Sequence, residues 1–445
     1  MIKKAIHVGL IGFGTVGTGM AAVLIEHAEL IARRVGAKIL LTQIADVDIK
    51  RSRGIKIKNN ILTTDPYDII RNPKNDIVVE LIGGIDIPYK LILDAIAHGK
   101  HVVTANKALL ATHGEAIFKA AEKAGVEVLF EGAVGGGIPI IRAIKEGLSA
   151  DKIVGLFGIL NGTSNYILTK MSAEGRDFSE VLKEAQSLGY AEANPKLDVG
   201  GGDSAHKLAI LALLAFGTPI SIDDIFTEGI DKISPQDIAF ASEFGYTMKL
   251  LAIAKEVAGK LEARVHPTMI PKDEILAKVN GVFNAIGILG KSVGETLFYG
   301  RGAGAMPTGS AVVSDLIAIA RNILNQSHDD KPHRSLPATG MISGERVVLP
   351  IKPMSEIESR YYLRFMVEDF PGVLSKISGV LGRHHIGIAS VIQQGRKEAG
   401  AVPLVMMTHK AREKDVQMAL QKINQSDCVY KNAVLIRVED KEGAI

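Results

Sequence analysis

A glycine-rich turn near the N-terminus constrains the fold of this chain more than any other stretch. Residues Ala5 to Ile11 form an apolar run typical of a buried strand, and Gly12-Phe13-Gly14-Thr15-Val16-Gly17 then opens a helical pattern that reaches about Arg34. The first glycine permits a tight turn, the second lets the backbone approach a pyrophosphate, and the third allows close packing of helix on strand. The turn therefore predicts a βαβ unit that binds a dinucleotide, with Gly12, Phe13, Gly14, Thr15, Val16 and Gly17 at the cofactor.

The next predicted strand ends in residues that bear on the choice of dinucleotide. Residues Lys38 to Ala45 form this strand, Asp46-Val47-Asp48 follows it, and Lys50, Arg51 and Arg53 lie just beyond. An acidic residue at this strand end binds the ribose 2′-hydroxyl of NAD, whereas neighbouring cations favour the 2′-phosphate of NADP. Both signals are present, so the sequence leaves NAD or NADP open.

Strand and helix patterns then continue to alternate. Strands are predicted at Asp76 to Ile82, His101 to Thr104 and Val126 to Phe130, with a helix from Pro88 to His98. Such alternation predicts an α/β fold with a doubly wound parallel sheet of the Rossmann type.

The stretch Thr104-Ala105-Asn106-Lys107 follows the carboxyl end of one of these strands, the edge at which such sheets bind ligands. We therefore place Thr104 and Lys107 at the cofactor, although a surface lysine is the ordinary alternative for Lys107. Further along, Tyr299-Gly300-Arg301-Gly302-Ala303-Gly304 precedes a helix from about Thr308 to Leu324. This second glycine-rich approach adds Gly302 to the predicted cofactor site.

A third glycine-rich stretch runs from Glu131 to Pro139, with the sequence Glu-Gly-Ala-Val-Gly-Gly-Gly-Ile-Pro. Closely spaced glycines permit the backbone to turn its carbonyls or amides toward a ligand. A flexible crossover between domains explains the same composition, and the residues alone do not decide between the two.

The strongest candidate for chemistry is the stretch from Pro195 to Leu208, where three glycines end and an apolar helix begins. Asp203 falls at its N-cap or first turn, and Lys207 follows four residues later, so carboxylate and amine share one helix face. An exposed cap and ion pair is the ordinary explanation. The helix is apolar on nearly every side, however, and charges at the mouth of a buried helix are costly unless they are partnered or used. Lys207 is therefore the predicted general acid–base group.

Two more carboxylates precede this helix. Glu192 and Asp198 lie close to Asp203 in the sequence, and together they could hold an ammonium group. A strand at Ile153 to Leu160 leads into Asn161-Gly162-Thr163-Ser164-Asn165-Tyr166, a helix start rich in small hydrogen-bonding groups. Helix capping explains this second motif equally well.

Composition limits the possible partners. The chain has 445 residues, enough for two to four domains, and its 52 Lys and Arg residues nearly balance 49 Asp and Glu residues. This balance predicts neither nucleic acid nor a membrane as partner. The single cysteine, Cys428, cannot form an internal disulfide, which fits a cytoplasmic protein. No stretch is long and apolar enough for a membrane span, and the N-terminus lacks a signal-peptide cleavage site.

Residues 5–325 resemble homoserine dehydrogenases through the motifs Gly-Phe-Gly-Thr-Val-Gly, Thr-Ala-Asn-Lys, Glu-Gly-Ala-Val-Gly-Gly-Gly-Ile-Pro, Asn-Gly-Thr-Ser-Asn-Tyr and Leu-Asp-Val-Gly-Gly-Gly-Asp-Ser-Ala-His-Lys-Leu. The resemblance implies reversible hydride transfer between NAD or NADP and the pair L-aspartate 4-semialdehyde and L-homoserine, on the route to threonine, isoleucine and methionine. It implies proton transfer by Lys107 and Lys207. It implies that Glu192 and Asp203 hold the substrate, and we place Asp198, Gly137 and Thr163 in the same substrate-binding site.

The same resemblance implies a monovalent cation, usually sodium, at positions Glu131, Val134, Gly136 and Ile138. Backbone oxygens suit such a hard cation. The chain departs from the family at Val47, where many members carry an arginine, and this departure weakens a prediction of NADP.

The C-terminal part has a different pattern. Alternating strand and helix signals predict the order βαββαβ, and with Asp369-Phe370-Pro371-Gly372-Val373-Leu374 at the first turn this part resembles an ACT domain. The resemblance implies threonine as effector, while subunit pairing remains the alternative. We predict a dinucleotide-binding domain at 1–150, to which the helix at 308–325 returns, a substrate and dimerisation domain at 151–325, a linker at 326–358 and an ACT domain at 359–445.

We expect a homodimer or homotetramer. Two other functions stay open from the sequence: a sensor that binds the cofactor without catalysis, and a dehydrogenase for another small aldehyde or hydroxy acid.

Overall fold

The computed structural model describes residues 4–326, 337–342, 345–393 and 401–440. The chain forms two compact units, each built from three segments. The first unit comprises Met1–Leu160, Asp203–Ile225 and Phe283–Leu349, and the second comprises Asn161–Gly202, Phe226–Val282 and Pro350–Ile445. The units are described separately.

The first unit contains the predicted parallel sheet. Its strand order is β3-β2-β1-β4-β5-β6, and every neighbouring pair is parallel. Apolar side chains fill the central strands because both faces of the sheet are covered. The strands are β1 (Ala5–Ile11), β2 (Lys38–Ala45), β3 (Leu62–Thr63), β4 (Ile77–Glu80), β5 (His101–Thr104) and β6 (Val128–Leu129).

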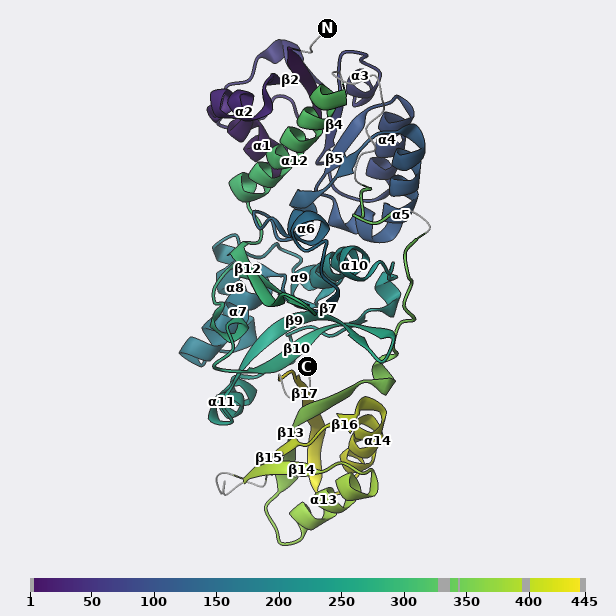
Figure 1. Cartoon of the computed structure of the whole chain (residues 1–445). Helices are drawn as coiled ribbons and strands as arrows, with labels where there is room; N and C mark the ends of the chain where they lie inside the picture. The colour runs from purple at the N-terminus through teal and green to yellow at the C-terminus, as the bar shows by residue number, and fades with distance from the viewer. Residues whose placement is uncertain (1–3, 327–336, 343–344, 394–400, 441–445) are drawn as a thin grey trace. The chain divides into compact units, whose positions relative to one another are not determined.

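Helices cover the two faces of this sheet in two sets (Figure 1). One set shares a core with β1 and consists of α1 (Thr15–Glu26), α2 (Ala28–Val35) and α12 (Ala305–Gln326). The other set packs on the opposite face and consists of α3 (Tyr67–Ile70), α4 (Asp86–Ala97) and α5 (Lys107–Ala124). The doubly wound fold predicted from the sequence is therefore confirmed, and a helix from late in the chain packs beside α1.

One predicted helix was wrong in its extent. The helical pattern from Thr15 to about Arg34 is broken at His27, where α1 and α2 bend by 77°. The bend brings Ile31 and Val35 of α2 into the same core as α1. Within the described residues no single helix is long and apolar enough to span a membrane, and the bent pair α1 and α2 meets that test by length and composition only.

The first unit also holds a small antiparallel sheet and the helix with the candidate lysine. The strand order is β12-β11-β7, with β7 at Ile153–Ile159, β11 at Phe283–Gly290 and β12 at Gly294–Arg301. Helix α10 (Gly202–Phe216) is buried along almost its whole length, as its apolar sequence predicted. The short helix α6 (Ile140–Arg142) leads into a π turn.

The second unit is built around the strand order β9-β10-β17-β13-β15-β14. Strands β9 (Tyr246–Val257) and β10 (Lys260–Pro271) form a long hairpin. The helices of this unit outside its C-terminal part are α7 (Gly162–Glu174), α8 (Phe178–Ser187), α9 (Lys196–Val199) and α11 (Pro235–Glu243), and the short strand β8 (Phe226–Thr227) pairs with β10.

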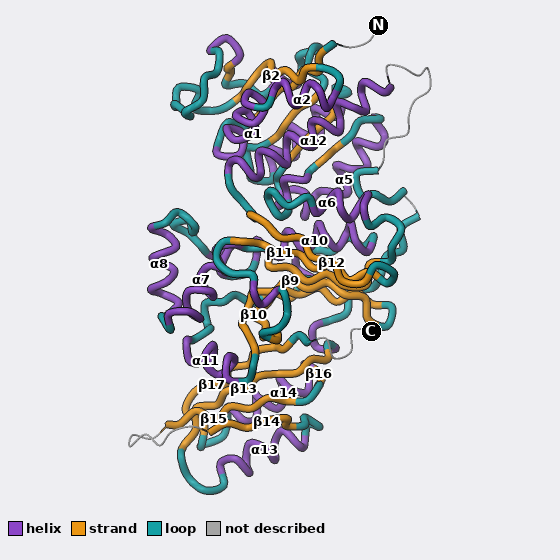
Figure 2. The backbone as a smooth tube through the Cα atoms, turned by 60° about the vertical axis from the view of Figure 1, so that its left-hand side comes forward, coloured by secondary structure: helices purple, strands orange, loops and turns teal. Residues whose placement is uncertain are grey.

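The C-terminal part has the predicted βαββαβ order, with one short additional strand, β16. Its helices α13 and α14 pack on one face of the strands (Figure 2). Strand β17 pairs antiparallel with β13 and parallel with β10, through Thr268 opposite Arg437 and Met269 opposite Val438. The elements are β13 (Glu358–Glu368), α13 (Val373–Arg383), β14 (Ile388–Gln393), β15 (Ala401–Thr408), β16 (Ala411–Arg412), α14 (Glu413–Asn424) and β17 (Val429–Val438).

The predicted linker at 326–358 is only partly covered, because residues 327–336 and 343–344 lie outside the described residues. The amide of Leu261 donates to the carbonyl of Pro350 at 2.9 Å, and the amide of Lys352 donates to the carbonyl of Leu261 at 2.8 Å. Residues 350–352 therefore run beside the start of β10 and are joined to it by main-chain hydrogen bonds.

Candidate active site

The loop after β1 has the geometry that its glycines predict. Gly12 has φ +97°, and a Cβ there would lie 2.6 Å from the backbone of Leu81. Helix α1 begins with no side-chain cap and no acidic residue in its first turn, and a Cβ on Gly14 would face open space. The amides at this helix N-terminus are thus left for an anion, so the residues fit the pyrophosphate of a dinucleotide.

The carboxyl ends of β4 and β5 are joined by side chains. The hydroxyl of Thr104 donates to Glu80 at 2.7 Å, and the amide of Ile82 donates to the same carboxylate at 2.8 Å. Burial raises the pKa of Glu80. Asn106 caps α5 by accepting from the amide of Leu109, and its side-chain amide donates to the carbonyl of Gly84 at 2.7 Å. These contacts fix the start of α5, whose first residue is Lys107.

Two lysines from different helices share one carboxylate. Asp203, in the first turn of α10, lies 2.6 Å from Nζ of Lys207 through Oδ2 and 3.2 Å from Nζ of Lys107 through Oδ1. Nζ of Lys207 also donates to the carbonyl of Leu160, beyond β7, at 2.7 Å. The side chains of Lys207 and Asp203 are 10% and 6% exposed, whereas that of Lys107 is 36% exposed. The sequence prediction that the charged pair on α10 is buried is therefore confirmed.

The immediate surroundings of this cluster include groups that the sequence motifs did not single out. The side-chain amide of Asn284 donates to the same Leu160 carbonyl at 2.9 Å. His206 lies three residues after Asp203 on α10, and burial lowers its pKa. Asn284 was missed because it stands in none of the motifs, and His206 was passed over although it lies between Asp203 and Lys207 in one of them. A carbonyl such as that of Leu160 leaves no sequence signal at all.

The glycine-rich stretch after β6 folds against the other glycine-rich approach. A Cβ on Gly136 would lie 2.5 Å from the backbone of Gly302, and the amide of Gly137 donates to the carbonyl of Arg301 at 3.1 Å. The structure thus brings together two of the three predicted glycine-rich sites, including Gly137 and Gly302.

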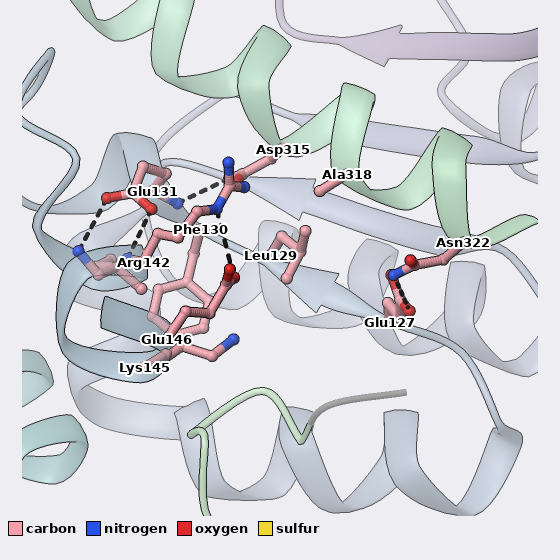
Figure 3. A pocket seen from close by; sticks show the side chains of 11 residues that line it. Glu127, Leu129, Phe130, Glu131, Arg142, Lys145, Glu146, Asp315, Ala318 and Asn322 are labelled. Atoms are coloured by element: carbon pink, nitrogen blue, oxygen red, sulfur yellow. Dashed lines mark hydrogen bonds and ion pairs between the residues drawn. The ribbon is translucent and has the colours of Figure 1, made fainter. Parts of the chain in front are cut away.

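The carboxylate of Glu131 is already engaged within the protein (Figure 3). It accepts from the amides of Ile141 at 2.8 Å and Arg142 at 3.0 Å, while the amide of Glu131 donates to Asp315 at 2.7 Å. Burial raises the pKa of Glu131, and burial with the nearby Glu131 charge raises that of Asp315 to about 8.

Because this carboxylate caps α6, a cation at the predicted positions Glu131, Val134, Gly136 and Ile138 would depend on backbone oxygens. In the part of the chain that is described, no three His, Cys, Asp or Glu side chains gather as a metal site.

A cavity of about 70 Å³ lies beside Glu131 and Asp315. The buried side chain of Lys145 lines it together with Arg142 and Glu127 (Figure 3). Burial lowers the pKa of Lys145. Acidic and basic side chains thus both line this cavity.

The remaining predicted substrate residues belong to the second unit. Asn161 caps α7 by accepting from the amide of Ser164, as the capping alternative proposed, and its side chain also donates to Asp198 at 2.8 Å. The hydroxyl of Thr163 donates to the carbonyl of Tyr190 at 2.5 Å. The exposed Glu192 lies in the same loop as Tyr190. The structure therefore brings Thr163 and Asp198 to the segment that carries Glu192, while Lys107, Asp203 and Lys207 lie in the first unit.

Three family profiles cover most of the chain. Residues 12–131 match the NAD-binding domain of homoserine dehydrogenase, residues 139–317 match homoserine dehydrogenase, and residues 361–427 match the ACT domain.

Relatives match over nearly the full length. The chain is 46% identical over 439 residues to homoserine dehydrogenase of Pseudomonas aeruginosa and 45% identical over 436 residues to that of Neisseria gonorrhoeae, covering 98% of this chain and 99% of the relative in both cases. A solved homoserine dehydrogenase from Thiobacillus denitrificans superimposes with a TM-score of 0.91 at 45% identity, over 98% of this chain and 99% of that one. A hyperthermophilic archaeal homoserine dehydrogenase in complex with NADPH matches with a TM-score of 0.59 at 26% identity, over 71% of this chain and 97% of that one.

A Rossmann sheet with an uncapped helix N-terminus, together with a buried lysine–carboxylate cluster, defines an NAD(P)-dependent oxidoreductase. The full-length matches are more specific. The chain belongs to the homoserine dehydrogenase family and carries a C-terminal ACT domain. Its reaction is the reversible reduction of L-aspartate 4-semialdehyde to L-homoserine.

Proposed function

We propose that Lys207 donates the proton to the aldehyde oxygen during reduction and that Asp203 and Leu160 hold its ammonium group in place for this step. The nicotinamide, when bound, supplies the hydride and takes it back in the reverse direction. Negative charge that develops on the substrate oxygen is stabilised by an ammonium donor within hydrogen-bond reach. Two of the three N–H groups of Lys207 are directed to Asp203 and Leu160, which leaves the third for the substrate.

The observation that carries this proposal is the burial of the Lys207 ammonium between two acceptors at 2.6 and 2.7 Å. A solvated surface lysine would not be held in this way. A buried, doubly anchored ammonium is preorganised for charge that appears only in the transition state.

Lys107 is proposed as the group that exchanges the proton with solvent. It contacts the other oxygen of Asp203 and is far more exposed than Lys207. The shared carboxylate therefore links a buried donor to a lysine that water can reach.

Lys207→Ala tests the assignment. We expect kcat for L-homoserine oxidation to fall by roughly 10²–10⁴-fold, because the group that takes the hydroxyl proton in this direction and returns it during reduction is removed. The dissociation constant of the reduced cofactor, measured by its fluorescence, should stay nearly unchanged, because the Gly12–Gly17 loop is intact. Lys119→Ala, which removes an exposed ammonium from the same helix as Lys107, is the control. Unchanged turnover of the Lys207 variant would remove Lys207 from this role.

For the substrate we propose that Glu192 and Asp198 bind the ammonium group, together with Asp203, and that Gly137 and Thr163 border the site. The support is chemical, since carboxylates bind an ammonium group and the Asn161 and Thr163 contacts anchor the segment from Tyr190 to Asp198. For the cofactor we propose contacts from the 12–17 loop, Thr104, Lys107 and Gly302.

A sodium ion held by backbone oxygens of Glu131, Val134, Gly136 and Ile138 remains a proposal. It is supported by the engagement of the Glu131 carboxylate, which leaves main-chain oxygens as the available ligands. Stimulation of activity by sodium relative to a bulky organic cation tests it.

We also propose that L-threonine is the effector bound by the ACT domain, that the protein is a cytoplasmic homodimer or homotetramer, and that its domains divide at 1–150, 151–325, 326–358 and 359–445. The ACT domain supports an amino-acid effector. A sensor without catalysis is disfavoured because both lysines and the carboxylate between them are assembled.

A further inference from the structure

The carboxylate that follows β2 is held rigidly beside the cofactor loop. Asp46 accepts from the amide of Phe13 at 2.6 Å through Oδ2 and from the amide of Asp48 at 2.8 Å through Oδ1. Nη2 of Arg53 adds a third contact at 3.0 Å. Because two of these donors are main-chain groups, the Asp46 carboxylate cannot turn away from the loop without breaking hydrogen bonds at its own strand end.

The nearest cation is already used by the protein. Nε of Arg53 donates to the carbonyl of Phe13, and Nη1 donates to the carbonyl of Arg51 at 2.7 Å. The guanidinium lies 4.7 Å from the centre of the Phe13 ring, and the side chain is only 9% exposed. Each of the three guanidinium nitrogens of Arg53 therefore donates a hydrogen bond within the protein. These bonds fold the segment from Asp46 to Arg53 against Phe13 and hold the Asp46 carboxylate in place.

The position next to Asp46 offers no compensating charge. Val47 is 95% exposed, and a neutral side chain there contributes nothing to binding a phosphate. Lys50 and Arg51 are exposed, and neither is among the groups that contact the Asp46 carboxylate. A 2′-phosphate carries about −1.5 to −2 charges at neutral pH. Placed against a fixed carboxylate it meets like-charge repulsion, whereas ribose hydroxyls can donate to that carboxylate.

We infer that the enzyme is selective for NAD(H) over NADP(H), with Asp46 as the residue that discriminates and Arg53 as the residue that positions it. The inference rests on the proposed function, since it concerns the cofactor of the same site. It assigns the ribose hydroxyls to Asp46 and attributes rejection of the 2′-phosphate to the same carboxylate.

Binding of reduced cofactor to the full-length protein is the direct test, followed by nicotinamide fluorescence. We expect NADH to bind at least about tenfold more tightly than NADPH, because one charge-assisted hydrogen bond is exchanged for one repulsive contact. The ratio of kcat/KM for NAD and NADP with L-homoserine should show the same order. Equal binding, or tighter binding of NADPH, would overturn the inference.

Two variants localise the effect. Val47→Arg supplies the missing cation and should tighten NADPH binding by about tenfold with little change for NADH. Val47→Met, similar in length but uncharged, is the matched control and should leave both dissociation constants unchanged. Asp46→Asn removes the repulsion and should narrow the NADH preference, and its melting temperature is recorded because the variant also loosens the loop. An unaltered preference in a folded Asp46→Asn protein would show that Asp46 does not discriminate.

Cofactor binding and L-homoserine oxidation, measured separately, distinguish this inference from the proposed function. Selective NADH binding without L-homoserine oxidation would leave the inference standing and refute the proposed catalytic roles. Equal oxidation of L-homoserine with both cofactors would leave the catalytic roles standing and refute the inference.

Discussion

At the scale of single residues, the candidate active site is built around one carboxylate, Asp203, that two lysines share. Asp203 contacts two ammonium groups, so its charge is compensated twice and its orientation is fixed from both sides. Burying a carboxylate of this kind is costly unless it is paired and hydrogen-bonded. The second lysine therefore has a structural role as well as a proposed chemical one, and substitutions of Lys107 and Lys207 should not be additive.

Asp315 should make stability depend on pH. Its pKa is raised from 3.8 to about 8, first by burial and then by the Glu131 charge, so the folded protein favours the protonated form. The resulting stability is present below the ordinary pKa and is lost progressively as the pH rises toward 8. Asp315→Asn mimics the neutral form, and its melting temperature relative to the unaltered protein should increase between pH 5 and pH 8.

Asp151→Asn is the control with the opposite sign. Hydrogen bonds from the amides of Val293 and Ser292 lower the pKa of Asp151, so its charged form is favoured in the folded state. The cost of this substitution should be greatest at neutral pH and should vanish in acid. If the two variants respond to pH in the same direction, the burial argument for Asp315 is wrong.

A site residue could be predicted from the sequence when its side chain carries the chemistry and stands within a recognisable motif. Asp203 and Lys207 are four residues apart on an apolar helix, so their shared face followed from helical periodicity. That Lys107 joins them was expected only from the family resemblance, because no periodicity relates residues about a hundred positions apart. The carbonyl of Leu160 and the amide of Asn284 have no sequence signature, and only the fold places them at Lys207.

At the scale of elements, helix α11 is fastened to β13 by a buried ion pair within the second unit. Asp237 accepts two hydrogen bonds from Arg364, at 2.6 and 3.0 Å, and one from the hydroxyl of Tyr362 at 3.0 Å. The same carboxylate completes a capping box with Ser234 at the start of α11. One side chain thus caps the N-terminus of a helix and ties that helix to the ACT sheet.

Asp237→Ala should destabilise the protein by about 3–5 kcal/mol, because it leaves the Arg364 charge partly buried without its partner. Chemical denaturation monitored by circular dichroism measures the loss. Asp231→Ala, which removes an exposed carboxylate from the same unit, should change stability by less than about 0.5 kcal/mol. Similar stabilities of the two variants would show that the pair contributes little.

Helices and strands were predicted correctly where glycine marks the turn between them or where the spacing of apolar residues changes from that of a helix to that of a strand. Strand β5 was predicted with its observed ends, and the order of the ACT elements was confirmed. The break between α1 and α2 was missed because His27 is neither glycine nor proline. The β9–β10 hairpin was not predicted, because most side chains in these strands are buried and show no alternation, and because Ala258, with φ 52°, stands where asparagine or aspartate usually marks such a turn.

At the scale of the whole molecule, the ACT fold is an integral part of the second unit. Strand β17 pairs with β10, and Glu439 just beyond it accepts from Lys255 at 2.7 Å and Arg264 at 2.6 Å. Arg437 on β17 also donates to Glu413 of α14 at 2.6 Å. An effector bound to the ACT elements therefore acts on strands that are hydrogen-bonded to the long β9–β10 hairpin.

L-Threonine should lower activity and raise the melting temperature of the protein, since a ligand that binds only the folded state stabilises it. Hydrogen exchange should then slow in β10 as well as in β13 and β17, because these strands form one ladder. Titration with L-threonine against L-alanine as control measures both effects. If the ACT domain only pairs subunits, neither amino acid will alter activity or exchange.

The β10–β17 pairing also affects how such regulation should be studied. Removing the C-terminal domain by truncation would remove the pairing of Thr268 and Met269 in β10 with β17 and leave main-chain groups of this short stretch without their partners, while β8 and β9 stay paired with β10. A loss of activity in such a shortened protein would report on the altered edge of β10 as well as on the missing effector site. Point substitutions in an intact chain avoid this artefact.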